Sequence, residues 1–210
     1  GRERGGRDMI GPVYVVTDPD SPHSVLDQAR AAARGGAWAV QIRDKGASDA
    51  EIAVLTREIM AELAPLGVRV FVNDRVAVAR DTGADLHIGQ GDGDARAARA
   101  QIAPEALLGL SIDALPQCAA IPEGVDYIGI GPLRTTATKP DAASPLGFEG
   151  IAAIAAASPV PSVAIGGITA EDARALKKTG VSGMAIVSAV TRAADPEAAT
   201  RALLEAWSKT

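Results

Sequence analysis

Hydrophobic and polar positions along this chain form a repeating pattern, in which short β-branched runs are followed by longer alanine-rich stretches. The short runs have the length and composition of buried strands, and the alanine-rich stretches have the spacing of amphipathic helices. The pattern repeats to the end of the chain without a break in composition. The predicted strands are residues 13–17, 39–43, 68–73, 85–89, 107–111, 127–131, 162–166 and 184–188.

A predicted helix follows each strand, and several helices have recognisable start and stop signals. Ser48 with Glu51, and Thr169 with Asp172, place a capping oxygen and an acidic residue in a first turn. Gly67 falls where a helix should end. The expected helices are residues 24–34, 48–63, 75–81, 95–102, 114–120, 148–157, 170–179 and 196–207, of which the fifth is weak.

Strand-helix units of about 25 residues, repeated eight times, favour a closed (β/α)8 TIM barrel in the α/β class. An open flavodoxin-like sheet would need only about five strands. The weak fifth helix and the glycine- and proline-rich stretch 132–147 are where this interpretation could fail. We predict a single domain over residues 1–210, and leave residues 1–8 out of the fold prediction because the sequence does not say whether they are native.

Composition narrows the class of protein. Aromatic residues are 3% of the chain, so the core should consist of Ala, Val, Ile and Leu, as in a parallel sheet covered by helices. The net charge of −5 and the lack of a long basic run argue against a nucleic-acid partner. No apolar run reaches the ~18 residues of a membrane span, and a single cysteine, Cys118, agrees with a reducing compartment. We therefore expect a cytoplasmic protein that binds small molecules and no membrane, and the sequence leaves open whether it forms a homo-oligomer.

Polar residues gather at the carboxyl ends of the predicted strands, where a TIM barrel places its active site. In the second strand, the two-residue period puts Gln41, Arg43 and Lys45 on the inner face. A solvated charge cluster is the weaker interpretation, because a strand covered by helices has no solvated face. These three donors predict an anion site.

Two carboxylates follow the next two strands, Asp74 after the third and Asp92 after the fourth. Each alone could equally be a loop cap. Mg²⁺, however, binds through one or two carboxylates and completes its shell with water and substrate phosphates. Beside the three donors of the second strand, the pair therefore predicts a Mg²⁺-diphosphate site.

A second anion site is expected after the seventh and eighth strands, because these loops usually bind phosphate in this fold. Gly166 and Gly167 precede the helix at Thr169, and the eighth strand ends at Val187 and Ser188. Two anion sites suggest a transferase that joins two phosphorylated substrates.

Three further features of the rim bear on ligand binding. His87 should point into the barrel, where a packed core histidine is favoured over a catalytic base. Gly129 and Gly131 should face inward and leave room for a ligand. The hydroxyls and the lysine of residues 135–139 suit a phosphate-covering loop, although an ordinary polar loop would look similar.

Taken together, these residues resemble the thiamine phosphate synthase family. The matching stretches run in order along nearly the whole chain, so the resemblance is far more specific than any one motif. The family normally continues after the serine at position 111 with a short polar stretch that often contains His, whereas this chain has Ile112-Asp113-Ala114-Leu115-Pro116. The matching stretches are residues 14–18, 40–45, 72–75, 86–92, 109–111, 126–132, 136–139 and 164–168.

The resemblance implies a reaction in which 4-amino-2-methyl-5-hydroxymethylpyrimidine diphosphate and thiazole phosphate give thiamine phosphate and pyrophosphate. It implies that pyrophosphate leaves first and that the thiazole nitrogen then captures the pyrimidine methylene cation. It also implies the residues of each subsite, of which Arg43, Lys45, Lys139 and Ser111 would be catalytic. Gln41, Arg43, Lys45, Asn73 and Lys139 would hold the diphosphate, Asp74 and Asp92 would ligate Mg²⁺, Ser111 would lie beside the pyrimidine diphosphate, and Thr136, Thr138, Gly167, Val187 and Ser188 would bind the thiazole phosphate.

Two alternatives remain for the function. A related thiazole tautomerase uses the same barrel, but its relatives tend to lose the metal carboxylates and to use a His near the fifth strand. This chain keeps Asp74 and Asp92 and has no His near that strand, so the sequence favours the synthase. A non-catalytic phosphate-binding barrel would need neither the carboxylate pair nor a leaving-group site.

Overall fold

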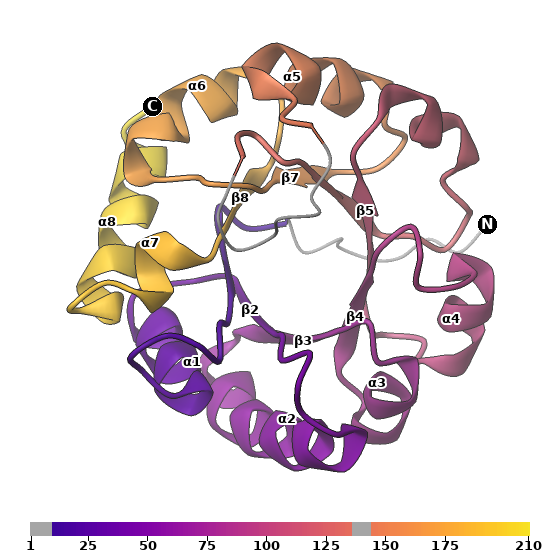
Figure 1. Ribbon diagram of the computed structural model, residues 1–210, viewed down its shortest axis with the longest axis vertical. Coiled ribbons are helices and arrows are strands. Elements are labelled where there is room, and N and C mark those ends of the chain that lie inside the picture. Colours follow the sequence, from indigo (N-terminus) through magenta and orange to yellow (C-terminus); the bar gives the residue numbers. More distant parts are fainter. Residues whose placement is uncertain (1–9, 136–143) are drawn as a thin grey trace.

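The computed structural model describes residues 10–135 and 144–210 of the chain. Parallel strands in sequence order close into a barrel, with helices on the outside (Figure 1). Each predicted strand coincides with an observed one, and the ends differ by at most two residues. The TIM-barrel prediction is confirmed. The strands are β1 (Val13–Val16), β2 (Ala39–Ile42), β3 (Arg69–Asn73), β4 (Asp85–Ile88), β5 (Leu108–Ile112), β6 (Tyr127–Ile130), β7 (Ser162–Ala164) and β8 (Gly183–Ile186).

The helices follow the prediction, with four differences, of which the first is an unexpected 3₁₀ turn at residues 64–66. The expected helix at 114–120 is a 3₁₀ segment, because Pro116 and Pro122 flank a stretch too short to propagate an α-helix. The helix expected at 170–179 begins as a 3₁₀ turn. An unexpected short helix starts at Ser188. The helical segments are α1 (Val25–Arg34), α2 (Asp49–Leu63), η1 (Ala64–Leu66), α3 (Val76–Thr82), α4 (Ala95–Gln101), η2 (Leu115–Ala120), α5 (Gly147–Ala157), η3 (Ala170–Asp172), α6 (Ala173–Lys178), α7 (Ser188–Thr191) and α8 (Pro196–Ser208).

Local sequence signals explain several helix boundaries. The Ser48 hydroxyl accepts from the backbone N–H of Glu51, whose carboxylate accepts from the backbone N–H of Ser48, so the predicted capping box is present. Gly67 has a φ of 74°, in the left-handed region that glycine adopts without steric cost, and it ends η1.

The core has two layers of different composition. Aliphatic side chains, including Val40 and Ile42, fill the space between the sheet and the helices, as predicted. Inside the barrel, however, Tyr14, Phe71 and Tyr127 are fully buried, and their ring centroids lie 5.1–6.0 Å apart. The expectation of an entirely aliphatic core is therefore wrong for the barrel interior, where the few aromatic residues of the chain concentrate.

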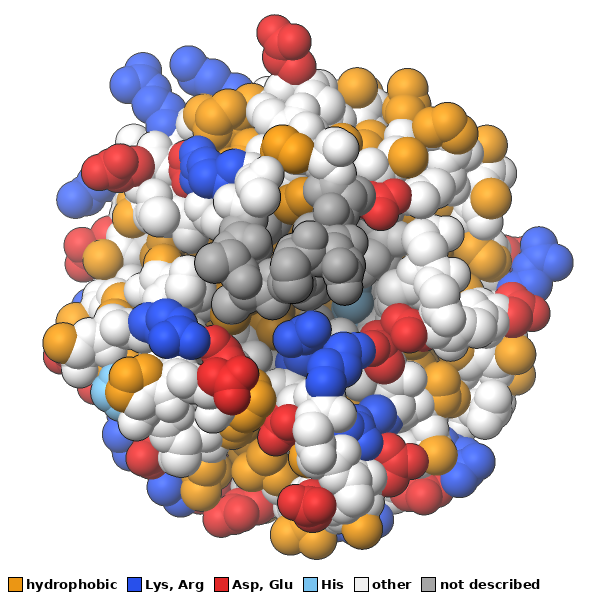
Figure 2. All heavy atoms as spheres, in the orientation of Figure 1, with side chains coloured by type: hydrophobic (Ala, Val, Ile, Leu, Met, Phe, Trp, Pro, Cys, Tyr) orange, Lys and Arg blue, Asp and Glu red, His pale blue; other side chains and the backbone are white. Residues whose placement is uncertain are grey.

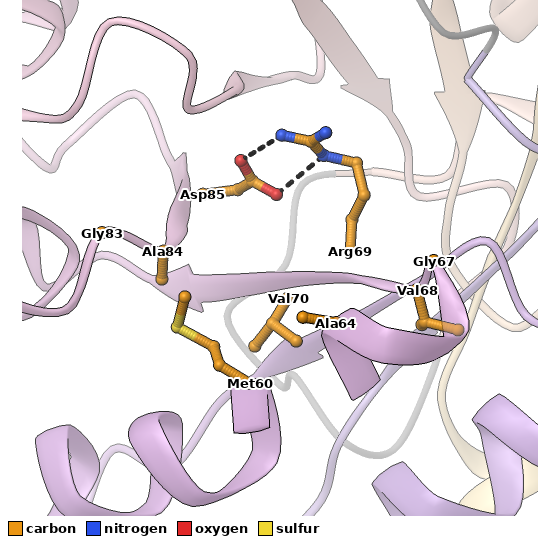
Figure 3. Close-up of a pocket in the computed structure, with 9 residues that line it drawn as sticks. All are labelled: Met60, Ala64, Gly67, Val68, Arg69, Val70, Gly83, Ala84 and Asp85. Carbon is orange, nitrogen blue, oxygen red and sulfur yellow. Dashed lines mark hydrogen bonds and ion pairs between the residues drawn. The ribbon is translucent and has the colours of Figure 1, made fainter. Parts of the chain in front are cut away.

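The amino-terminal end of the barrel contains a hollow of about 360 Å³ beside α2, β3 and β4 (Figure 3). Two of its lining residues, Arg69 and Asp85, form a bidentate ion pair with N···O distances of 2.9 and 2.7 Å. Burial raises the pKa of Asp85, and the ion pair opposes that rise. Because these charges are matched and lie at the starts of the strands, we interpret this end as structural. Among the described residues, no helix has the length and hydrophobicity needed to cross a membrane.

Candidate active site

Charged side chains of both signs gather around the mouth of the barrel (Figure 2). Most of the residues singled out from the sequence lie at the carboxyl ends of the strands, on the loops that follow them, or just inside the barrel. The loops after β2, β3 and β4 hold the candidate diphosphate half, and the loops after β6, β7 and β8 hold the candidate phosphate half.

Gln41 and Asn73 meet inside the barrel, just below its rim. Gln41 is 4% exposed, and its Oε1 accepts from Asn73 Nδ2 at 2.8 Å. The predicted inward direction of Gln41 is therefore correct. Both amides are held by other side chains, so they are positioned before any ligand binds.

Arg43 and Lys45 lie beyond the end of β2, which stops at Ile42. The two-residue alternation ends with the strand, so it does not establish which way these two side chains point. Lys45 nevertheless reaches the site, since its ammonium forms an ion pair with Asp74. The backbone N–H of Arg43 donates to Thr17 Oγ1 at 3.1 Å, and its guanidinium has no hydrogen-bond or ion-pair partner within residues 10–135 and 144–210.

Asp74 and Asp92, which the sequence predicted to lie over the same rim, come within hydrogen-bonding reach of each other. Burial raises the pKa of Asp74, and Asp92 adds to the rise, against the effect of Lys45. The pKa of Asp92 is lowered: burial alone would raise it, but the contacts with Asp74, the Gly89 N–H and Lys45 outweigh burial. Two carboxylates held this close favour a bound cation.

The backbone at Asp74 supports a functional role for this position. Asp74 is the non-glycine residue with a positive φ (63°) in the described part of the chain. Such a conformation costs on the order of 1 kcal/mol and persists where the surroundings enforce it, which is common at ligand sites. Here the Asp74 N–H donates to the His87 carbonyl at 2.9 Å.

Arg75 was not singled out by sequence reasoning, although it adjoins Asp74. Its guanidinium donates to the carbonyl oxygens of Asp44 and Ala47 at 2.7 and 2.6 Å and pairs with Asp49 at 2.7 Å. It therefore fixes the loop that carries Lys45 against the loop that carries Asp74. Adjacency to Asp74 was the only sequence signal for this role.

The loops after β6 and β7 are joined around the Gly166-Gly167 turn. Gly166 has a φ of 106°, and a Cβ there would lie 2.6 Å from Pro132 Cα, so only glycine fits. The N–H groups of Leu133 and Arg134 donate to the carbonyl oxygens of Ile165 and Gly166 at 2.8 and 3.2 Å. These hydrogen bonds tie residues 133 and 134, at the start of the loop after β6, to the loop after β7.

Arg134 was also missed, and it holds this turn in place. Its Nη1 donates to the Gly167 carbonyl at 2.6 Å, and its two Nη atoms bind the Asp172 carboxylate at 2.7 and 2.8 Å. Asp172 in turn accepts from the Thr169 N–H at 2.9 Å, in the predicted cap. Arg134 is the largest influence that lowers the pKa of Asp172.

Val187 and Ser188 were predicted at the end of the eighth strand, but they lie just beyond it. β8 ends at Ile186, Val187 is the residue before α7, and Ser188 is the first residue of that helix. The strand predicted at 184–188 is therefore too long at its end. Both residues still lie at the carboxyl end of β8, next to β7.

Ser111 and His87 form a hydrogen-bonded pair on adjacent strands, with 2.8 Å between Ser111 Oγ and His87 Nε2. His87 is 8% exposed, so it is buried as expected, but it is bound to a rim hydroxyl and not simply packed. A Cβ on Gly129 would lie 3.3 Å from His87 Cε1, so Gly129 makes room for the imidazole. Gly131 instead allows close contact with the Ile165 carbonyl, which corrects its expected role in opening a cavity.

Three predicted residues, Thr136, Thr138 and Lys139, lie outside the described residues. Their assignments to the phosphate and diphosphate groups stay predictions.

Comparison with known proteins agrees with this arrangement. The profile of the thiamine monophosphate synthase family matches residues 13–190, which is most of the barrel. The chain belongs to this family. Among curated members, the thiamine-phosphate synthase of Azorhizobium caulinodans is 40% identical over 195 residues, 91% of this chain and 92% of the relative. That of Corynebacterium jeikeium is 41% identical over 207 residues, 93% of this chain and 94% of the relative.

A solved family structure has the same fold. The thiamine phosphate pyrophosphorylase of Pyrococcus furiosus superposes with a TM-score of 0.86 at 32% identity and covers 94% of this chain and 96% of that one. A 3-hexulose-6-phosphate synthase is 19% identical with a TM-score of 0.67, so it shares the fold alone. The family assignment therefore rests on the sequence and structure of thiamine phosphate synthases and not on the barrel in general.

Proposed function

We propose that this chain is a Mg²⁺-dependent transferase of thiamine biosynthesis. It couples 4-amino-2-methyl-5-hydroxymethylpyrimidine diphosphate to 4-methyl-5-(2-phosphoethyl)thiazole and releases pyrophosphate. The observation that carries this proposal is the cluster of Asp74, Asp92 and Lys45 beside Gln41 and Asn73, at the rim of a barrel that belongs to the thiamine monophosphate synthase family. The family acts on small molecules, and we propose that this member does so in the cytoplasm.

The residues present suit Mg²⁺. The described residues contain no group of three or more His, Cys, Asp or Glu side chains that could hold a metal ion by themselves. Mg²⁺ needs fewer protein ligands, since one or two carboxylates suffice when water and phosphate oxygens complete the shell. Asp74 and Asp92 would supply those carboxylates. When bound, the ion would neutralise charge on the leaving diphosphate.

The chemistry needs a site that stabilises a departing anion. The bond between the pyrimidine methylene carbon and the diphosphate oxygen breaks, and its electron pair leaves with the diphosphate. The ammonium of Lys45, which pairs with Asp74, and the guanidinium of Arg43 would bind the negative charge that develops. The amides of Gln41 and Asn73 are already held by hydrogen bonds. They would therefore not have to reorient when the substrate binds.

The second substrate completes the reaction. The lone pair of the thiazole nitrogen forms the new bond to the methylene carbon, so no proton transfer is required. We assign the thiazole phosphate to the backbone around Gly167 and to Val187 and Ser188, and, from the family resemblance alone, to Thr136 and Thr138. Lys139 would join the diphosphate ligands, and Ser111 would lie beside the pyrimidine substrate. The absence of an acid-base demand agrees with a rim rich in cations and carboxylates.

A direct assay tests this proposal. The protein is mixed with both substrates, with and without Mg²⁺, and thiamine phosphate and pyrophosphate are measured. We expect equal amounts of both products, formed only with Mg²⁺. Isomerisation of the thiazole phosphate without coupling would identify a tautomerase, and binding without turnover would identify a phosphate-binding barrel.

Variants locate the activity. We expect Asp92→Ala and Arg43→Ala each to abolish coupling while the circular dichroism spectrum and unfolding temperature stay near those of the parent protein, because both residues lie on the rim. Arg30→Ala is the matched control, since Arg30 on α1 forms an exposed pair with Glu62 on α2 and should leave coupling unchanged. Normal turnover by Asp92→Ala or Arg43→Ala would contradict the site assignment.

A further inference from the structure

A continuous row of side-chain hydrogen bonds crosses the barrel interior and joins the two sides of the rim. Its members come from six strands, and each is bound to the next at 2.8–2.9 Å. We call this row the inner relay. In order, it consists of Asn73, Gln41, Tyr14, Tyr127, His87 and Ser111.

The amide end sets the direction in which hydrogens are donated. Asn73 Nδ2 donates to Gln41 Oε1, and Gln41 Nε2 donates to the Tyr14 hydroxyl. An amide nitrogen is only a donor, so the Tyr14 oxygen must accept. Tyr14 has one hydrogen of its own to donate, and its other partner among the described residues is the Tyr127 hydroxyl at 2.9 Å. Tyr14 therefore donates to Tyr127.

The same reasoning fixes the state of the histidine. Because Tyr127 accepts from Tyr14, its hydrogen goes to His87 Nδ1 at 2.8 Å. Nδ1 is then an acceptor, so the neutral imidazole carries its proton on Nε2 and donates it to Ser111 Oγ at 2.8 Å. Burial raises the pKa of both tyrosines, so the phenols keep the hydrogens that this direction requires.

Neighbouring residues make room for the relay. A Cβ on Gly109 would overlap the ring carbon Cζ and the hydroxyl of Tyr127, so glycine at this position allows the Tyr127 ring to cross β5. Gly129 leaves room for the His87 ring in the same way. The relay also packs against other aromatic side chains, since the rings of Trp38 and Phe71 lie 5.6 and 5.1 Å from the Tyr14 ring, between centroids.

We infer that Tyr14 and Tyr127 are positioning residues that fix the Nε2–H tautomer of His87 and thereby free the Ser111 hydrogen for a ligand. Ser111 Oγ accepts from His87, so its own hydrogen is available to an acceptor atom of a substrate at the rim. The opposite tautomer would require the Ser111 hydrogen to point at the histidine. This inference rests on the proposed function for the identity of the ligand, but the tautomer itself does not depend on it.

The tautomer can be measured without any assay of activity. The chain contains two histidines, so ¹⁵N NMR of the imidazoles in the parent protein and in His23→Asn assigns the signals of His87. We expect a protonated Nε2 and an unprotonated Nδ1 in the folded protein. A protonated Nδ1, or an even mixture of tautomers, would overturn the inference.

Variants separate positioning from packing. Tyr127→Phe removes the donor to Nδ1, so we expect mixed tautomers and a kcat lower by roughly tenfold with little change in the KM of either substrate. Tyr14→Phe interrupts the relay one step earlier and should have the same effects to a smaller degree. Trp38→Phe is the control, because Trp38 packs against both tyrosines but lies outside the relay.

The outcomes distinguish this inference from the proposed function. If the parent protein couples its substrates and Tyr127→Phe alters neither the tautomer nor kcat, the positioning role is wrong. If the parent protein shows the expected tautomer but no coupling, the proposed function is wrong and the relay stands. Thermal unfolding of each variant identifies any loss of activity that comes from loss of the fold.

Discussion

Replacing Arg134 by methionine should destabilise the protein by about 1–2 kcal/mol, a value between those of exposed and buried ion pairs. The side chain of Arg134 is 45% exposed and that of Asp172 is 9% exposed, so one partner is partly solvated and the other is not. Exposed pairs contribute about 0–1 kcal/mol, whereas breaking a fully buried pair costs about 3–5 kcal/mol. The variant would leave the Asp172 carboxylate with the Thr169 N–H but without its guanidinium partner.

The effect should depend on pH with a definite sign. Arg134 lowers the pKa of Asp172, so the ion pair stabilises the fold above the ordinary Asp pKa of about 3.9 and is lost as the pH falls through the lower, folded-state value. The difference in stability between the parent protein and Arg134→Met should therefore be full at neutral pH. It should shrink as the pH falls below about 3.9.

Thermal unfolding followed by circular dichroism measures this difference. For a chain of this size, about 1–2 kcal/mol corresponds to a decrease in Tm of about 2–8 °C. Arg30→Met is the matched control, because Arg30 forms an equally bidentate pair with Glu62 on the exposed surface and should change Tm little. Equal effects of the two substitutions, or an effect of Arg134→Met that is independent of pH, would refute the reasoning. In the coupling assay, Arg134→Met should also raise the KM for thiazole phosphate more than the KM for the pyrimidine diphosphate.

Three other predictions concern the rim and the strands below it. Asp92→Asn should raise the Mg²⁺ concentration needed for half-maximal coupling, because the pair with Asp74 loses a negative charge. A Mg²⁺ titration at saturating substrates would detect this shift, and an unchanged midpoint would exclude Asp92 as a ligand. Gly109→Ala should cost about 1–3 kcal/mol in urea unfolding, because the added methyl group overlaps the Tyr127 ring. Gly131→Ala should destabilise the fold similarly, because the added methyl group would overlap the Ile165 carbonyl oxygen. Wild-type stability in either variant would show that the strands can separate to accommodate the methyl group.

The barrel could be predicted because its signal is local. Each strand buries both faces and each helix buries one, so hydrophobic periodicity marks nearly every element within a few residues. The exceptions arose where the chain leaves regular structure. β2 ends at Ile42 and β8 ends at Ile186, and the two-residue alternation says nothing of side chains beyond those points.

The candidate site was only partly predictable. Asp74 and Asp92 could be paired because parallel strands bring their carboxyl ends to one rim. The hydrogen bond between Tyr14 and Tyr127 could not be predicted, since the two residues are separated by 113 positions and look like ordinary core residues in a hydrophobic pattern. Arg134 was missed for a similar reason, because its partners Gly167 and Asp172 come from another loop.

The central claim is that one rim holds a Mg²⁺-diphosphate beside Asp74 and Asp92 and a second phosphate at the Gly167 turn. The most direct test is a crystal structure of the protein with pyrophosphate, thiamine phosphate and Mn²⁺, which replaces Mg²⁺ at oxygen sites and is located by its anomalous scattering. We expect the anomalous peak within coordination distance of both carboxylates, pyrophosphate near Lys45, and the phosphate of thiamine phosphate on the backbone of Gly167. A metal or pyrophosphate bound elsewhere, with these carboxylates uncoordinated, would contradict the account.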